Sequence, residues 1–153
     1  MTELYSTVYA LHASDGTTLW QYRLNSGKTG WANLLAFADG LMYIGVSGGQ
    51  NGGTISALRA ADGSLAWSQQ VAQRADQAIV SRGTMYVSSS ERAAYALRLS
   101  DGKRLWLHPL GESTFEPLAL LGSTLYVGGN LQTVYALDVT NGAQRWKYSA
   151  SAG

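Results

Sequence analysis

The sequence contains no cysteine, and this absence excludes several kinds of site. Without cysteine there is no disulfide, no thiolate-bound zinc, no iron–sulfur cluster and no cysteine nucleophile. Charge is also scarce, since 14% of the residues are charged and the formal net charge is +1. The lysines and arginines are scattered and form no basic stripe. We therefore predict no nucleic-acid partner.

Long hydrophobic runs are lacking too. No apolar run approaches the length of a membrane-spanning helix, so we predict no membrane span. The first residues, Met1–Tyr5, have neither the basic segment nor the apolar segment of a secretory leader. We therefore predict no signal peptide in this chain. The compartment stays open, because a chain without cysteine suits oxidising and reducing surroundings alike.

Proline occurs only twice, whereas there are 18 glycines, 9 tyrosines and 5 tryptophans. Abundant glycine and aromatics with little proline favour short strands joined by tight turns. Apolar residues make up 46% of the 153 residues, a globular composition with enough length to bury a core.

An internal repeat is the strongest signal in the sequence. Four segments begin with Ala-Leu, carry Asp-Gly or Asn-Gly at their sixth and seventh positions, and end on Trp at the eleventh. They are residues 10–20, 57–67, 96–106 and 136–146. A fixed period of about 40 residues is typical of propeller blades.

Two more elements precede the last three of these segments. One is a short run centred on Tyr43, Tyr86 or Tyr126, and the other is an aliphatic run further upstream, with a turn signal between them. Each complete repeat is therefore predicted to form four antiparallel strands. We name them A (the aliphatic run), B (around Tyr), C (around Ala-Leu) and D (ending at Trp). Asp-Gly or Asn-Gly between C and D suits a tight reversal.

The first repeat is incomplete. Leu4 and Tyr5 stand where strand B is expected, but they lie too close to Ala10, and no strand A precedes them. The predicted fold class is all-β, a β-propeller with about 3.5–4 four-stranded blades in one (half-)domain. The predicted blades are residues 1–24, 30–71, 75–110 and 115–150.

The motif Ala-x-x-x-x-(Asp/Asn)-Gly-x-x-x-Trp resembles the tryptophan-docking motif of the PQQ-like (pyrroloquinoline quinone) repeat. This blade is known from quinoprotein dehydrogenases, from an outer-membrane assembly lipoprotein and from many bacterial sensor proteins. The copy at residues 136–142 is the most similar to the usual family pattern. The resemblance implies a ring of seven or eight blades, of which this chain supplies about half. It also implies an often extracytoplasmic location.

The four motif tryptophans are predicted to be structural docking residues that tie neighbouring blades together. Each offers a large apolar face and one N–H donor, and four equivalent residues cannot all be catalytic. They are Trp20, Trp67, Trp106 and Trp146.

The resemblance also raises the question of catalysis with a quinone. Quinoprotein dehydrogenases are similar to one another in a vicinal cysteine pair, in acidic and Asn calcium ligands and in a catalytic Asp. Cysteine is absent here, and Asp15, Asp62 and Asp101 fall in the recurrent turns, while His12 and His108 lie at unrelated phases. We therefore predict no catalytic residue, no metal site and no cofactor. The alternative is PQQ with calcium in a quinoprotein dehydrogenase, or in a part of one.

The candidate binding residues lie in the D-to-A connections and at the starts of the A strands. Such positions tend to line one mouth of a propeller channel. Here they differ between blades, as residues that read a partner would, although loops also vary without function. The candidates are Lys28, Trp31, Asn33, Arg74, Asp76, Gln77, Glu112 and Glu116.

The sequence favours a non-catalytic binding or scaffold module, whose ligand it leaves open between a protein and a small molecule. Alternatives are the quinoprotein dehydrogenase and the sensor portion of a larger bacterial signalling protein. An open blade exposes unpaired edges. We therefore expect two chains to associate into a homodimer that closes a ring of about eight blades, the other reading being a piece of a longer propeller.

Overall fold

The structure is a computed structural model that describes residues 5–25, 32–47, 53–71, 74–114, 117–130 and 132–150. Every regular element in these ranges is a β-strand, which confirms the predicted all-β class. The described residues contain no helix that could cross a membrane. The chain divides into two compact units, Met1–Arg74 and Ala75–Gly153, and each is taken by itself below.

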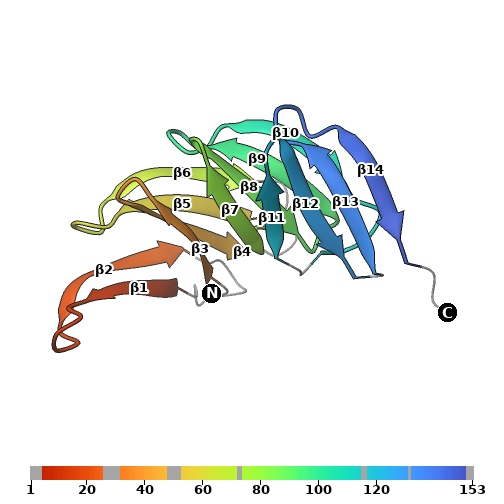
Figure 1. Ribbon diagram of the computed structural model, residues 1–153. Coiled ribbons are helices and arrows are strands. Elements are labelled where there is room, and N and C mark those ends of the chain that lie inside the picture. Colours follow the sequence, from red (N-terminus) through yellow and green to blue (C-terminus); the bar gives the residue numbers. More distant parts are fainter. Residues whose placement is uncertain are drawn as a thin grey trace. The chain divides into compact units, whose positions relative to one another are not determined.

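The first unit contains a half blade and a complete blade (Figure 1). The half blade is a two-stranded antiparallel sheet of β1 (Tyr5–Leu11) and β2 (Thr18–Asn25). The complete blade is a four-stranded meander in the order β3-β4-β5-β6. Its strands are β3 (Ala32–Ala38), β4 (Leu41–Ser47), β5 (Gly53–Arg59) and β6 (Leu65–Val71).

The second unit contains two complete blades with the same meander. The first consists of β7 (Gln77–Ser81), β8 (Thr84–Ser89), β9 (Ala93–Arg98) and β10 (Arg104–Pro109). The next consists of β11 (Leu118–Leu121), β12 (Thr124–Gly129), β13 (Thr133–Asp138) and β14 (Gln144–Ser149). Strand β11 lies beside β7, so the two A strands are neighbours.

The two residues of each Asp-Gly or Asn-Gly turn have different structural roles. In the first turn, the Gly16 amide donates to the His12 carbonyl at 2.8 Å, with Gly16 at a φ of +73°. Asp15 accepts a hydrogen bond from the Thr17 amide at 2.9 Å. Glycine supplies the left-handed backbone, and the Asp or Asn side chain satisfies the next amide but one. The later turns repeat both bonds around Gly63, Gly102 and Gly142.

A β-bulge precedes each motif tryptophan. In the complete blade of the first unit, Ala57 pairs with Trp67 and Leu58 pairs with Leu65, so one residue of β6 has no partner in the ladder. The same shift occurs in β2, β10 and β14. A bulge bends its strand and re-aims the neighbouring side chains. It also brings the tryptophan of strand D near the tyrosine of strand B, with ring centroids 5.8 Å apart for Tyr43 and Trp67.

The first repeat differs from the expectation in one respect. Tyr5, which we assigned to the position of strand B, begins β1 and pairs with Asn25 of β2. The same strand continues to Ala10, which pairs with Trp20. Tyr5 therefore belongs to strand C, and the described part of the first blade consists of strands C and D alone.

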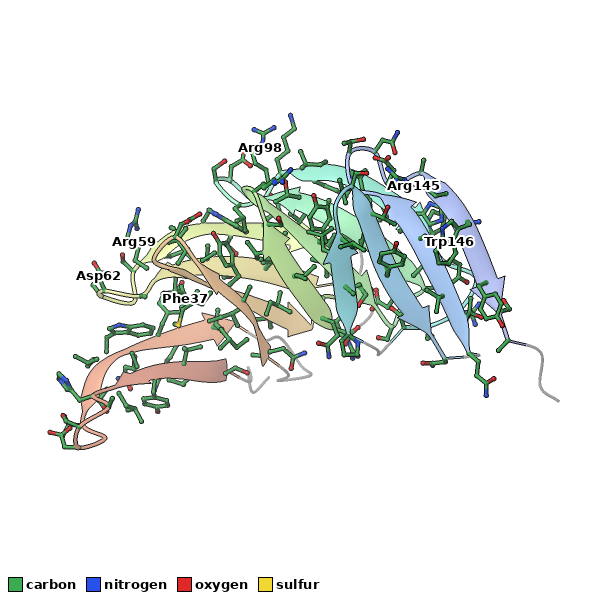
Figure 2. All side chains as sticks on the ribbon, in the orientation of Figure 1. Phe37, Arg59, Asp62, Arg98, Arg145 and Trp146 are labelled. Carbon is green, nitrogen blue, oxygen red and sulfur yellow. The ribbon has the colours of Figure 1, made fainter. Side chains whose placement is uncertain are left out.

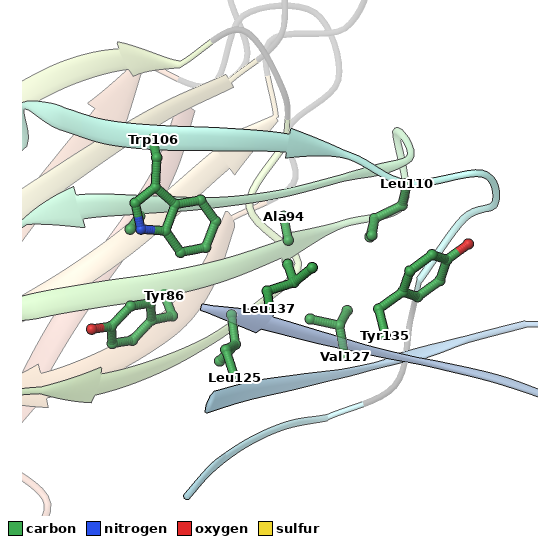
Figure 3. Packing of buried hydrophobic residues seen from close by; sticks show 9 residues of the cluster. Tyr86, Ala94, Trp106, Leu110, Leu125, Val127, Tyr135 and Leu137 are labelled. Carbon is green, nitrogen blue, oxygen red and sulfur yellow. The ribbon is translucent and has the colours of Figure 1, made fainter. Parts of the chain in front are cut away.

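In each unit, a hydrophobic core lies between the two blades of that unit. In the second unit, Trp106 and Tyr86 of one blade pack against Leu125, Val127 and Leu137 of the next (Figure 3). A corresponding cluster in the first unit joins Leu24 of the half blade to Ile44, Val46 and Leu58. A blade face without a neighbour therefore leaves core-type side chains in solvent.

Candidate binding surfaces

Trp20 of β2 docks on the turn of the next blade. A Cβ atom added to Gly63 would lie 2.5 Å from Cε3 of Trp20, so the indole rests directly on this glycine. The indole Nε1–H donates to the Ala60 carbonyl at 2.9 Å. The turn glycine is required twice here, once for its φ of +72° and once for the space above it.

Trp106 of β10 makes the same contact in the second unit. A Cβ atom on Gly142 would lie 2.5 Å from Cε3 of Trp106, and Nε1–H donates to the Val139 carbonyl at 2.9 Å. A tryptophan of one blade thus joins the Gly turn of the following blade in both units. For Trp67 and Trp146 the docking role stays a prediction.

The last blade has an exposed tryptophan at the position that donates the hydrogen bond in this contact. Trp146 of β14 (labelled in Figure 2) is 46% exposed, whereas its equivalent Trp106 is 7% exposed. Tyr148, on the same face of β14, is exposed as well. Its equivalent in the half blade, Tyr22, packs against the core cluster of the first unit. The outer face of this blade therefore has the residues of an inter-blade core.

The half blade has an open turn glycine at the position on which a docking tryptophan rests. Gly16 has the same turn and φ as Gly63, but no described atom lies within 4 Å of a Cβ placed on it. Leu11 is 53% exposed, whereas its equivalent Leu137 is 0% exposed against the preceding blade. Tyr9 is exposed on the same face. The chain thus carries one donor face and one acceptor face of the same kind.

A groove of about 440 Å³ lies within the first unit, between the half blade and the A and B strands of the complete blade. It is lined by Ser6, Thr7, Val8, Tyr9, Ala32, Asn33, Leu34, Met42 and Ile44. Of the predicted binding residues, Asn33 contributes to this lining. Sequence reasoning did not find the groove, because its walls come from three strands, β1, β3 and β4.

Asp76 and Gln77 lie at the start of β7. Asp76 accepts hydrogen bonds from the Ser90 amide at 2.7 Å and from its hydroxyl at 2.8 Å, which holds the turn between β8 and β9. Burial, and after it the nearby carboxylates of Asp76 and Glu91, raise the pKa of Tyr95. Gln77 is exposed. The carboxylate of Asp76 thus has a structural use within its own blade.

Glu112 lies in the connection between β10 and β11 and is buried. Its Oε1 accepts from the Tyr135 hydroxyl at 3.3 Å, and that hydroxyl accepts from the Gly111 amide at 3.2 Å. A Cβ on Gly129 would lie 2.6 Å from the carboxyl carbon of Glu112, so this glycine makes room for the side chain. Glu112 therefore ties the connection to the following blade.

The remaining predicted residues are less informative. Arg74 is partly buried at the end of the first unit. Lys28, Trp31 and Glu116 lie outside the described residues. The structure places Asp76 and Gln77 side by side and Glu112 in another connection, so a role of these residues in reading a partner stays a prediction.

The described residues also bear on the alternative of calcium with a quinone. Within the described ranges, no three side chains of His, Cys, Asp or Glu stand close enough to hold a metal ion. Hydrogen bonds from Thr17 lower the pKa of Asp15, and those from Ser64 lower the pKa of Asp62, which suits carboxylates used in turns. We derive no chemistry through a quinone.

The repeats and these contacts agree with comparisons to known proteins. The family described as outer membrane protein assembly factor BamB matches residues 5–153. The chain belongs to this family. This confirms the resemblance to PQQ-like repeat propellers. No curated protein matches the chain.

Solved structures similar to this family member show the same fold. BamB from Moraxella catarrhalis is 20% identical, with a TM-score of 0.70, over 97% of this chain and 52% of that protein. The quinohemoprotein alcohol dehydrogenase ADHIIG from Pseudomonas putida HK5 is 20% identical, with a TM-score of 0.69, over 97% of this chain and 32% of the enzyme. The computationally designed Ika8 is 13% identical, with a TM-score of 0.74, over 92% of this chain and 42% of the design. The fold is that of a β-propeller, and the chain spans about half the length of the matched BamB.

Proposed function

We propose that this chain is a non-catalytic binding and scaffold module that associates with a second copy of itself. The observation that carries the proposal is the pair of complementary end faces. Trp20 rests on Gly63, and Trp106 rests on Gly142. Trp146 is the equivalent tryptophan of the last blade but is exposed. Gly16 is the equivalent glycine of the half blade, but no described atom lies within 4 Å of a Cβ placed on it. A family description that names an assembly factor is compatible with a scaffold.

The internal contacts indicate how a second copy would dock. Trp146 of one copy would rest on Gly16 of the other and donate to the Ala13 carbonyl, which is equivalent to that of Ala60. Tyr148 and Leu11 would then enter an apolar interface like those between the blades. Burying such side chains stabilises an interface by roughly 1.5–3 kcal/mol each. Two copies joined in this way are expected to close a ring of about eight blades.

The test is the mass of the chain in solution, measured by light scattering over a range of concentrations. We expect a dimer for the natural chain and a monomer for Trp146→Glu and for Leu11→Glu, because a charge cannot enter a desolvated interface unpaired. Leu105→Glu is the matched control, since Leu105 is 45% exposed and belongs to β10, which is a strand of neither the half blade nor the last blade. It should remain a dimer. A natural chain that stays monomeric at every concentration would contradict self-association.

The non-catalytic part of the proposal makes a separate prediction. Pyrroloquinoline quinone with calcium, added to the natural chain, should leave its thermal unfolding midpoint unchanged. The physical reason is linkage, because only a ligand that binds the folded state raises its stability. The measurement is calorimetry with and without both ligands, with calcium alone as the control. A rise that requires the quinone would favour the dehydrogenase alternative.

A further inference from the structure

We infer that one end of the blade formed by β7, β8, β9 and β10 is a docking surface for an anionic lipid layer. This end carries the β7–β8 turn and the β9–β10 turn. The two turns lie side by side, because the Leu99 amide donates to the Gly83 carbonyl at 2.9 Å. We call the exposed cations of these turns and of the strand ends beside them the cationic turn end. They are Arg82, Arg98, Lys103 and Arg104.

The two turns contain a single carboxylate, and its contacts are made within its own turn. Asp101 forms an ion pair with Arg98 at 3.2 Å and accepts a hydrogen bond from the Lys103 amide at 3.0 Å. Arg98 projects from this end of the blade (Figure 2). Within the described part of the chain, the side chains of Arg82, Lys103 and Arg104 form no ion pair. Three cations are therefore available to a partner.

The other complete blades show that the fold does not require these cations. The same two turns are joined there by the bonds from the Ala60 amide to the Gly40 carbonyl and from the Val139 amide to the Ser123 carbonyl. Uncharged or acidic residues occupy the positions equivalent to the three free cations. They are Asp39, Ser64 and Leu65 in one blade and Gly122, Ala143 and Gln144 in the other. The positive charge is thus specific to one blade.

Arg82 has a backbone conformation that disfavours its side chain. Its φ is +49°, in the left-handed region, and the equivalent residue of the last blade is Gly122. A side chain in this region destabilises the folded chain relative to glycine. Turn formation does not explain an arginine at this position, and local strain of this kind is typical of functional sites.

The geometry favours a layer of anions over a small anion. All four cations are exposed at turns, so a single bound ion would stay open to water. An apolar side chain lies on the same edge of the second unit. Leu121 ends β11, which lies beside β7, and it is 73% exposed just before the β11–β12 turn. Basic side chains with an adjacent apolar one bind anionic lipid surfaces, whereas a soluble anion offers Leu121 no apolar contact.

Sedimentation of the natural chain with lipid vesicles tests this inference. We expect binding to vesicles of phosphatidylglycerol and phosphatidylcholine in equal amounts, and none to pure phosphatidylcholine. Sodium chloride at about 1 M shortens the screening length to about 3 Å, so it should release most of the bound chain.

A triple variant removes the free cations and keeps the turns. Arg82→Gly, Lys103→Ser and Arg104→Gln introduce residues that the equivalent positions of the other blades already hold. One basic residue near an anionic surface changes the affinity about fivefold, so the triple variant should bind at least about tenfold more weakly. Its thermal unfolding, followed by circular dichroism, should show that it is folded.

Two single variants sharpen the test. Arg92→Gly is the matched control, since Arg92 is an exposed arginine of the same blade with a φ of +64°, but it lies in the β8–β9 turn at the opposite end. It should bind vesicles as the natural chain does. Leu121→Ser removes the apolar contact and should weaken binding about fivefold.

The inference is wrong if the natural chain does not bind the anionic vesicles, if the triple variant binds them as tightly, or if Arg92→Gly loses as much affinity. Inorganic phosphate or polyglutamate that binds more tightly than the vesicles, at the same concentration of anionic groups, would assign the surface to a small anion or an acidic protein instead. The monomeric Trp146→Glu variant should show the same loss on triple substitution. Failure of self-association is therefore distinguishable from failure of lipid binding.

Discussion

Trp106→Ala is expected to lower the free energy of unfolding of the second unit by about 3–5 kcal/mol. The side chain is 7% exposed and lies in the cluster between two blades, so its removal leaves a cavity that the flanking strands cannot fill. The Val139 carbonyl also loses the hydrogen bond from the indole. Urea unfolding followed by circular dichroism measures the loss.

Trp106→Phe divides this loss into two parts. Phenylalanine keeps an aromatic ring over Gly142 but has no N–H donor, so the decrease should be smaller than for alanine. Leu107→Ala on the same strand is a second comparison, because Leu107 is exposed. A decrease for Trp106→Ala no larger than that for Leu107→Ala would show that the docked indole does not hold the two blades together.

Gly142→Ala is expected to lower the free energy of unfolding by about 2–4 kcal/mol. Two effects add. Alanine at a φ of +72° is strained, and its Cβ would lie 2.5 Å from the Trp106 ring. Gly83→Ala isolates the first effect, since Gly83 in the same unit has a φ of +73° and no described atom within 4 Å of an added Cβ. That variant should lose only about 1–2 kcal/mol.

The two substitutions should also be coupled. Once Trp106 is alanine, the added methyl at Gly142 meets no ring, so Gly142→Ala should cost only the backbone part. Residues in contact show coupling energies of about 0.5–3 kcal/mol in such double-mutant cycles. Additive losses would mean that the two residues do not act through one contact, and the docking geometry at the blade junction would then need revision.

The repeat predicted the fold class for identifiable reasons. The turn at Asp15 and Gly16 is local, because glycine takes the left-handed backbone and aspartate caps an amide two residues on. Local turn formation of this kind can be predicted from the residue types alone. The β-bulge before each tryptophan was not predicted, since the extra residue becomes visible only when Ala57 is seen opposite Trp67. Because the pairing of β1 with β2 is not visible in the sequence either, we predicted that Tyr5 lies in strand B, whereas it lies in strand C.

The predicted channel-mouth residues show a second limit. Asp76 and Glu112 were predicted to bind a partner because the residues at their positions differ between blades. In the structure each accepts hydrogen bonds from residues well separated in sequence, Ser90 for Asp76 and Tyr135 for Glu112. A single sequence does not reveal such distant donors. The groove beside β1 was missed for the same reason, since its walls come from three strands.

The sequence by itself determined the blade and its phase and predicted which tryptophans dock, because alternation, turn chemistry and a tryptophan at a fixed offset act over a few residues. The tertiary structure decided which of these elements is satisfied. Trp106 rests on Gly142, whereas Trp146 is exposed and Gly16 is open. Whether a docking element is satisfied depends on the blade packed against it, and that blade lies beyond the reach of any local pattern.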